Sequence, residues 1–302
     1  MPGKLIAAAA ATAALAFVAC SGDADDPSGG DALQLIASNG IVADWVANVA
    51  GERAEVGAII PPGADLHSFQ LSPSSIRQIG EADIVFLVGA SLEASFEGVV
   101  RENASAPVIE LSDGLALRDS DADGHEGEED KDGHGELDPH IWMDADLAIG
   151  AVGRIADELA LIDPDGAAGY TANAERYTSE LRAMDETVAA RLAELPPARK
   201  LLVTFHDAYG YFADRYGLTV LGFVVENADE EPSAGAIADL VDAMEAAGAT
   251  TIYIEPQFNA RVVEQVADET GAEVRTIPSD ALSDEYPTYI ALMEAIAAGI
   301  AD

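Results

Sequence analysis

The fold class is decided by residues 33–60, which read LQLIASNGIVADWVANVAGERAEVGAII. A β-rich run at Leu33–Ala37 is followed by a helical pattern at Gly40–Val49 and by a second β-rich run at Ala54–Ile60. A strand, a helix and a strand in this order form the unit from which parallel sheets are built. The stretch therefore predicts an α/β fold with a parallel sheet.

The same alternation continues along the chain and predicts two lobes, each with a roughly four-stranded parallel sheet. In the first lobe the remaining expected strands are Ile84–Val88 and Val108–Glu110, and the remaining expected helices are Ser74–Gly80 and Leu92–Asn103. In the second lobe the expected strands are Lys200–Thr204, Thr219–Val224, Thr251–Ile254 and Glu273–Thr276, and the expected helices are Ala208–Tyr216, Ser233–Ala247, Arg261–Thr270 and Tyr286–Ala301.

A long helical pattern lies between the two sets. Pro164 stands just before it and Pro196 just beyond it, and proline marks helix ends. About 30 residues at 1.5 Å each span roughly 45 Å, which suits a helix that links two lobes, although a packed helix within one lobe fits the spacing too. We expect an N-terminal lobe at 32–164, a linking helix at 165–196 and a C-terminal lobe at 197–302. The spacing of one helix face is carried by Tyr170, Tyr177, Leu181, Met184, Val188, Leu192 and Leu195.

The first 20 residues have the features of an export signal. Lys4 precedes an uncharged, Ala-rich run that is too short to span a bilayer as a helix. Cys20 follows directly and resembles the lipidated cysteine of a bacterial lipobox, with residues 21–31 as a tether. The alternative is an ordinary signal that is cut earlier and leaves Cys20 as a free thiol.

The chain is strongly acidic, with 55 Asp and Glu against 15 Lys and Arg and a formal charge of −40. This charge excludes most nucleic-acid ligands and anionic membrane surfaces, because both require basic patches. Only three of the basic residues are Lys. A high-salt habitat and a GC-rich genome both account for this composition.

Residues 112–137 are dominated by Asp, Glu and Gly and lack an apolar period. The composition predicts a solvated loop. It contains His125 and His134, two of the five histidines. Among so many carboxylates these two are candidates for a weak accessory metal site, and a loop that only adds charge is the equal alternative.

The other three histidines, His67, His140 and His206, each lie in a loop or at the end of an expected strand. Ligands of open α/β sheets gather at the carboxyl ends of strands. Two of these histidines belong to the first lobe and one to the second. Taken together, they predict a metal site in the cleft, although any one of them alone fits an ordinary surface or core position.

Six motifs carry a resemblance to a known family that covers nearly all of residues 33–300. The chain resembles the zinc-type metal-binding solute-binding lipoproteins of ABC importers, cluster A-I. The resemblance implies two α/β lobes bridged by one long helix, with His67, His140 and His206 as metal ligands and Asp280 as the fourth. The motifs are IIPPGADLH at 59–67, DPHIWMD at 138–144, HDAYGYF at 206–212, EPSA at 231–234, YIEPQF at 253–258 and TIPSD at 276–280.

The donor set favours zinc over manganese. Manganese-type relatives carry Glu where this chain has His206, and three imidazoles with one carboxylate suit tetrahedral zinc better than harder, oxygen-preferring manganese. A turn role for Asp280, with water or another carboxylate as the fourth ligand, is the alternative. Ligating imidazoles usually bind a carboxylate through their other nitrogen. The carboxylates expected to do so, with capping as the alternative role of each, are Asp138, Asp144, Asp207 and Glu255.

The resulting expectation is an extracytoplasmic, monomeric zinc receptor that delivers Zn²⁺ to an ABC permease. It would be lipid-anchored at the outer face of the cytoplasmic membrane, or periplasmic, and would touch the membrane only through its anchor. A manganese or iron receptor and a surface adhesin with a structural metal are alternatives. A zinc hydrolase requires an open metal position and a general base, and the sequence contains no H-E-x-x-H motif. No catalysis is expected.

Overall fold

The computed structural model describes residues 32–64, 66–67, 69–120, 137–225 and 232–302. The expected signal, Cys20, the tether and both loop histidines, His125 and His134, lie outside the described residues. None of the helices in the described ranges combines the length and apolar character needed to cross a bilayer.

The first half of the chain forms a parallel sheet of four strands in the order β2-β1-β3-β4. All four residues of β3 are buried, as is typical of a parallel strand covered on both faces. The first expected α/β lobe is therefore confirmed. The elements are β1 (Leu33–Ala37), α1 (Gly40–Ala50), β2 (Ala54–Ala58), α2 (Pro73–Glu81), β3 (Ile84–Leu87), α3 (Glu97–Asn103) and β4 (Val108–Glu110).

Helix α1 begins at the predicted residue, Gly40, and Asn39 caps it. Oδ1 of Asn39 accepts hydrogen bonds from the backbone N–H groups of Ile41 and Val42, at 2.9 and 3.0 Å. Such a cap satisfies donors that the first helical turn leaves without partners. The apolar face of α1, which includes the fully buried Trp45, then packs into the core.

The second half contains the four expected strands as two parallel pairs, β5 with β6 and β7 with β8, and β5 lies beside β7. The described residues therefore show two hydrogen-bonded pairs where the sequence predicted one sheet. The elements are β5 (Leu201–His206), α6 (Gly210–Tyr216), β6 (Thr219–Val225), α7 (Ala234–Ala247), β7 (Thr251–Ile254), α8 (Arg261–Thr270), β8 (Glu273–Thr276) and α9 (Tyr289–Ala301).

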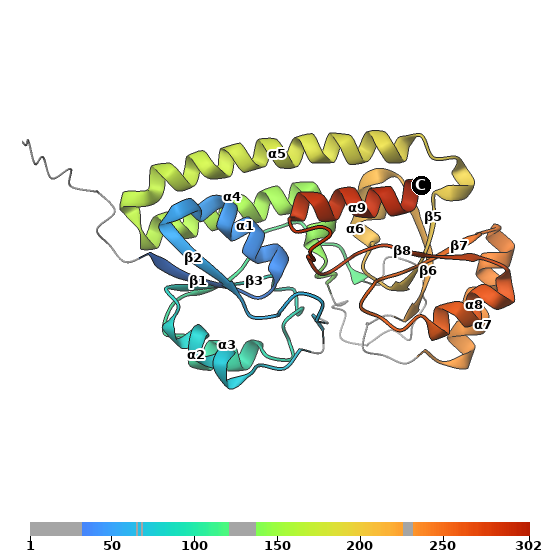
Figure 1. Ribbon diagram of the computed structural model, residues 1–302, viewed down its shortest axis with the longest axis horizontal. Coiled ribbons are helices and arrows are strands. Elements are labelled where there is room, and N and C mark those ends of the chain that lie inside the picture. The colour runs from blue at the N-terminus through green and yellow to red at the C-terminus, as the bar shows by residue number, and fades with distance from the viewer. Residues whose placement is uncertain (1–31, 65, 68, 121–136, 226–231) are drawn as a thin grey trace, which may run out of the picture. The chain divides into compact units, whose positions relative to one another are not determined.

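Helix α5 (Ala167–Ala193) has 27 residues, which corresponds to about 40 Å at 1.5 Å per residue. Figure 1 shows it running past α1, α4 and α9, and it packs against all three. The seven apolar residues that predicted one helix face are all buried. Six of them lie in α5, which confirms the helical period there, and Leu195 lies two residues beyond its end. Helix α5 thus contacts elements from both halves of the chain.

Helix α4 (Ala145–Ile162) was not expected from the sequence. It is capped by Asp144, whose Oδ1 accepts the backbone N–H of Asp146 at 2.7 Å. Seven of its residues are buried, and it packs against α1 and α5.

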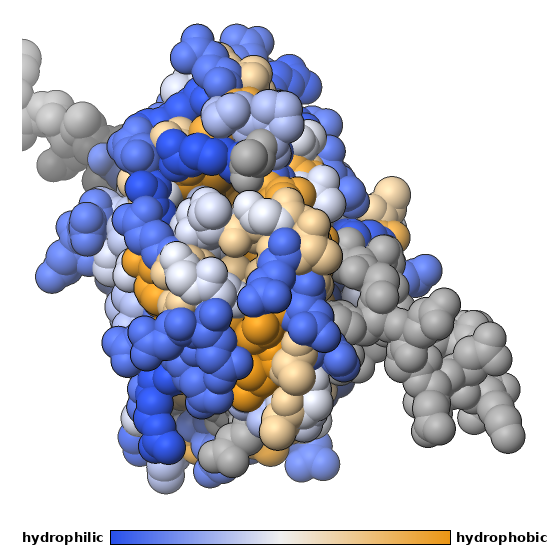
Figure 2. Space-filling view, turned by 90° about the vertical axis from the view of Figure 1, so that its right-hand side faces the viewer, coloured by the Kyte–Doolittle hydropathy of each residue, from blue (hydrophilic) through white to orange (hydrophobic). Residues whose placement is uncertain are grey.

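The buried apolar residues form two clusters. The larger cluster joins β1, β3, α1, α4 and α5 to α6 and α9. The smaller cluster lies around β5 to β8, α7 and α8. On the face shown in Figure 2, hydrophilic residues cover much of the surface with apolar residues between them, as a highly charged chain requires.

Candidate metal centre

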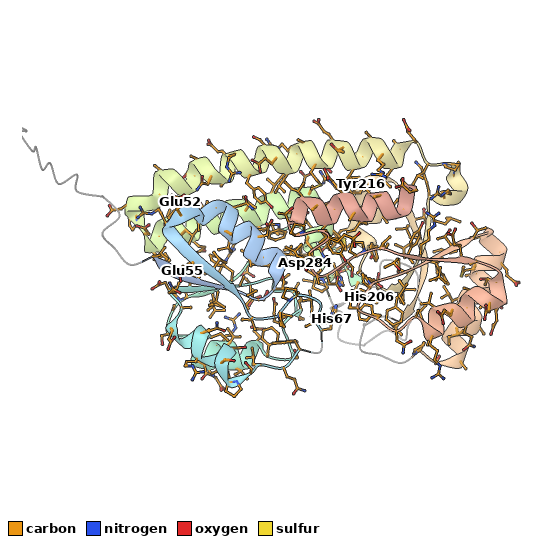
Figure 3. All side chains as sticks on the ribbon, viewed as in Figure 1. Glu52, Glu55, His67, His206, Tyr216 and Asp284 are labelled. Carbon is orange, nitrogen blue, oxygen red and sulfur yellow. The ribbon has the colours of Figure 1, made fainter. Side chains whose placement is uncertain are left out.

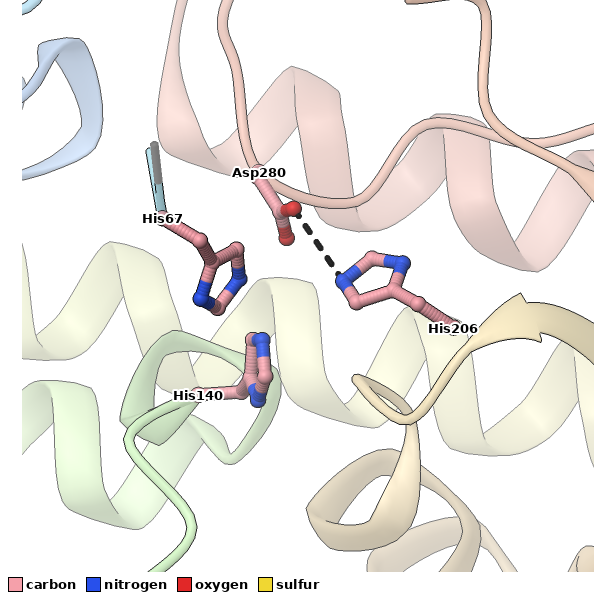
Figure 4. Close-up of side chains that lie close together, drawn as sticks. All are labelled: His67, His140, His206 and Asp280. Atoms are coloured by element: carbon pink, nitrogen blue, oxygen red, sulfur yellow. Dashed lines mark ion pairs between the residues drawn. The ribbon is translucent and has the colours of Figure 1, made fainter. Parts of the chain in front are cut away.

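Four side chains that could bind a metal ion converge in the structure: His67, His140, His206 and Asp280. Each contributes one nitrogen or oxygen atom to a group in which all four atoms lie within 4.8 Å of one another. The three imidazole rings form a nearly equilateral triangle, with centroid separations of 5.5, 5.5 and 5.8 Å. Figure 3 shows His67 and His206 approaching one another from separate parts of the chain, and Figure 4 shows all four side chains pointing inward.

The four residues come from four separate segments. His67 lies in the loop that follows β2, and His206 is the last residue of β5. His140 immediately precedes a short 3-10 turn at Ile141–Met143, and Asp280 lies four residues beyond the end of β8. Three of the four therefore lie at or beyond the carboxyl end of a parallel strand, where α/β proteins usually bind ligands. His140, His206 and Asp280 are buried, and His67 is half-buried.

Buried polar atoms in the group lack hydrogen-bond partners within the described residues. They include Nε2 of His140 and Oδ1 of Asp280. Nε2 of His206 lies 3.3 Å from Oδ2 of Asp280. Ligands about 2.0–2.1 Å from a tetrahedral zinc lie roughly 3.3 Å from one another, so this pair already has the separation of two zinc ligands. Burying such atoms costs free energy, and a divalent cation would compensate for that cost.

Two carboxylates lie behind the histidines. Oδ1 of Asp138 lies 2.8 Å from Nδ1 of His140 and also accepts the His140 backbone N–H at 2.9 Å. Oε1 of Glu255 lies 2.8 Å from Nδ1 of His206. A carboxylate at Nδ1 favours the tautomer in which Nε2 carries a lone pair for a metal. Both carboxylates therefore prepare their histidines for coordination through Nε2.

Asp144 has the alternative role given for it above, that of a helix cap. Its Oδ1 caps α4 and also accepts a hydrogen bond from Nη1 of Arg215 at 2.6 Å. Within the described residues the contacts of Asp144 are thus those of a helix cap and an ion pair. Asp207 directly follows His206 and is partly buried.

Two neighbouring carboxylates, Glu255 and Asp280, favour the protonated form of His206. Burial lowers the pKa of the His206 imidazole, but Glu255 and Asp280 outweigh burial, so that its pKa rises well above the ordinary value. Burial also raises the pKa of Glu255, against the opposing effect of His206. For Asp280, burial favours the neutral acid, but His206, His140 and His67 outweigh it and lower the pKa. Protons and metal cations would therefore compete for the carboxylate of Asp280 and the imidazole of His206.

Two aromatic residues of the site were not singled out by sequence, although both lie in quoted motifs. Nε1 of Trp142 donates to the carbonyl oxygen of Ser279 at 3.0 Å, and the hydroxyl of Tyr209 donates to the carbonyl oxygen of Pro278 at 3.0 Å. Both bonds end on the segment that leads into Asp280. The only signal in the sequence was a polar aromatic two or three residues from a candidate ligand.

Residues 35–302 match the family described as the periplasmic component A of the zinc-uptake complex, ZnuA. The chain belongs to the ZnuA family. The resemblance to metal-binding solute-binding lipoproteins of ABC importers is thereby confirmed, and the parallel strands described above confirm the α/β class.

Among curated relatives of this ZnuA-family chain, the manganese-binding lipoprotein MntA of Halalkalibacterium halodurans is 29% identical over 290 residues, which cover 93% of this chain and 92% of that protein. The iron ABC transporter substrate-binding lipoprotein MtsA of Streptococcus pyogenes is 26% identical and covers 85% of this chain, with 83% of its own length matched.

Two solved structures show the same fold. The periplasmic zinc-binding protein TroA of Treponema pallidum has a TM-score of 0.76 and 26% identity, over 90% of this chain and all of that one. A manganese-bound mutant of a periplasmic metal-binding protein from Candidatus Liberibacter asiaticus has a TM-score of 0.79 and 24% identity, over 90% of this chain and 99% of that one. The second likeness shows the fold alone.

Proposed function

We propose that this protein is an extracytoplasmic receptor that captures Zn²⁺ between its two halves and delivers it to an ABC permease. The observation that carries the proposal is the convergence of three imidazoles and one carboxylate, with ligand atoms within 4.8 Å of one another. The metal is cargo in this function, so the site needs only to bind and release it.

The choice of zinc rests on the donor atoms. Zinc accepts three nitrogens and one oxygen in a tetrahedron, whereas manganese prefers oxygen-rich surroundings. The relatives do not favour zinc, because MntA is named for manganese, MtsA for iron and TroA for zinc. A manganese or iron receptor is therefore the second candidate and has the support of those names.

The burial pattern suggests how an ion enters. Of the four proposed ligands, His67 alone is half-buried, while the other three are buried. An ion that approaches past His67 meets His140, His206 and Asp280 behind it. Nδ1 of His206 and Nδ1 of His140 face Glu255 and Asp138, so both histidines can offer Nε2 without rotating.

Metal analysis of the purified protein, with dissociation constants for Zn²⁺, Mn²⁺ and Fe²⁺, tests the proposal. We expect one tightly bound zinc and far weaker manganese. His206→Ala should weaken zinc binding strongly, because it removes a ligand and leaves Glu255 buried without its partner. Equal affinity for the metals, or an indifferent His206→Ala variant, would overturn the zinc assignment.

We further propose that Cys20 anchors the mature protein through lipid, with residues 21–31 as the tether. Stable anchoring requires more than one acyl chain, so the modified cysteine would carry several. A Cys20→Ser variant should be released from the membrane or remain unprocessed. Fractionation and migration identical to those of the parent would contradict the anchor.

The acidic loop is proposed to hold a second, weaker metal through His125 and His134. The chain enters and leaves it at an antiparallel bridge between Asp119 and Leu137. A variant that lacks residues 121–136 should keep the tight site and lose the weak second event in a zinc titration. If a zinc titration of the parent protein shows a single binding event, the loop holds no second metal and only adds charge.

A further inference from the structure

The segment that carries Asp280 is held by two buried aromatic hydrogen bonds, one from each half of the chain. Tyr209, directly before α6, binds the carbonyl oxygen of Pro278. Trp142, from the first half of the chain, binds the carbonyl oxygen of Ser279, 137 residues further along. Tyr209, Trp142 and Ser279 are each at most 1% exposed.

Trp142 also contacts a second ligand. Its ring lies 5.2 Å from the His140 ring in an edge-to-face arrangement, with an angle of 71° between the planes. Its own backbone carbonyl accepts a hydrogen bond of 2.6 Å from the hydroxyl of Tyr289 at the start of α9. Trp142 is thus held through its backbone carbonyl, its ring and its indole N–H.

We propose that Trp142 is a positioning residue for metal binding, which sets the place of the Asp280 carboxylate relative to His140 through its bond to Ser279. Since the carboxylate lies one residue beyond the bonded carbonyl, loss of the indole N–H frees the Asp280 backbone from the His140 turn. The site would then have to order this ligand when the metal binds, which lowers affinity. The inference rests on the proposed function.

The chain supplies its own control. Its only other tryptophan is Trp45, which is fully buried in the core and whose Nε1 has no hydrogen-bond partner within the described residues. Trp45→Phe therefore removes a buried indole of the same size without removing a hydrogen bond to the site, and it keeps an aromatic ring against Tyr289, which Trp45 contacts edge-to-face at 5.2 Å. Trp142→Phe removes the donor and retains an aromatic ring beside His140.

The test measures zinc affinity by competition with a fluorescent chelator. We expect Trp142→Phe to weaken zinc binding roughly tenfold or more, the range found when groups that orient metal ligands are removed, and Trp45→Phe to leave it unchanged. In an Asp280→Ala background, Trp142→Phe should have almost no further effect, because the residue it positions is gone. If the fold-losses in zinc affinity of the two single variants multiply in the double variant, the proposal is overturned, since Trp142 would then act independently of Asp280, through the fold.

A second arm avoids the question of folding. In the Trp45→Phe background, Trp142 is replaced biosynthetically by an isosteric analogue with sulfur in place of the indole N–H. Weaker zinc binding with an unchanged unfolding midpoint supports the positioning role, and unchanged affinity overturns it. If the unmodified protein binds no zinc, the proposed function fails instead. The two failures are thereby distinguished.

Discussion

Nδ1 of His206 lies 2.8 Å from Oε1 of Glu255, and neither side chain exposes any surface to solvent. The pair joins the last residue of β5 to the residue after β7. A charged carboxylate is retained in the interior only where a partner compensates for its desolvation. Here the partner is a proposed metal ligand, so the carboxylate influences how that ligand meets its ion.

Glu255→Gln should weaken zinc binding by roughly 10–100-fold, as is usual when a group that orients a metal-binding histidine is altered. The amide removes the negative charge that holds Nδ1 protonated and Nε2 available. A chelator competition measures the change, and Glu264→Gln, on the exposed side of α8, is the control. Equal affinities of the Glu255 variant and the parent would show that the pair does not tune the ligand.

Zinc binding should weaken as pH falls, and the decline should begin above the ordinary imidazole pKa of about 6.5. The reason is that Glu255 and Asp280 outweigh burial and raise the pKa of His206, so a proton competes with the metal at Nε2. A neutral imidazole is required for coordination. Dissociation constants between pH 5 and 8.5 provide the measurement. An affinity that is flat down to pH 6 would contradict this prediction.

His206→Glu should shift preference from zinc toward manganese. The substitution converts three nitrogens and one oxygen into a set of two and two, which is closer to the oxygen-rich surroundings that manganese prefers. The ratio of the two dissociation constants is the measurement, and the unfolding midpoint without metal checks that the new carboxylate beside Glu255 is tolerated. An unchanged ratio would show that position 206 does not select the metal.

Arg215 and Asp185 form a two-point ion pair between α6 and α5, at 2.6 and 2.7 Å. Hydrogen bonds from Arg215 lower the pKa of Asp185, so the pair stabilises the fold above the unfolded pKa of about 3.9. That stability is lost as pH falls through the lower folded pKa. Asp185→Asn should cost about 1.5–3 kcal/mol at neutral pH.

Urea unfolding at several pH values checks this prediction. The stability gap between Asp185→Asn and the parent should narrow below pH of about 4, where Asp185 begins to be protonated in the unfolded chain. Asp268→Asn, at an exposed position of α8, should show a small gap at every pH. A gap for the Asp185 variant that does not depend on pH would mean that the carboxylate charge contributes nothing.

Much of the fold could be predicted because its strands are short β-rich runs that alternate with helical patterns. Strands β1, β4, β7 and β8 have the predicted bounds. The buried face of α5 followed from spacing alone. Helix α4 was missed, because Gly150 and Gly153 interrupt its pattern and only packing against α1 and α5 compensates for their low helix propensity.

The parts of the site that escaped prediction depend on contacts between distant segments. Asp144 has the same local pattern as a carboxylate behind a ligand, and its partner Arg215 is 71 residues away. The bond from Trp142 to Ser279 spans 137 residues. No periodicity or spacing reports such a pair, because it arises only when the two halves of the chain pack together.

The bridge between Asp119 and Leu137 places these two residues side by side, so the chain leaves the described fold and rejoins it at the same place. The length of the chain between the two residues matters little to the rest of the fold, since each doubling of a loop's length adds only about 0.6 kcal/mol of closure free energy. Natural variants can lengthen or shorten it with little penalty. For the same reason a guest domain inserted between residues 119 and 137 should cost the fold little closure free energy, and it could report the capture of the ion in a living cell.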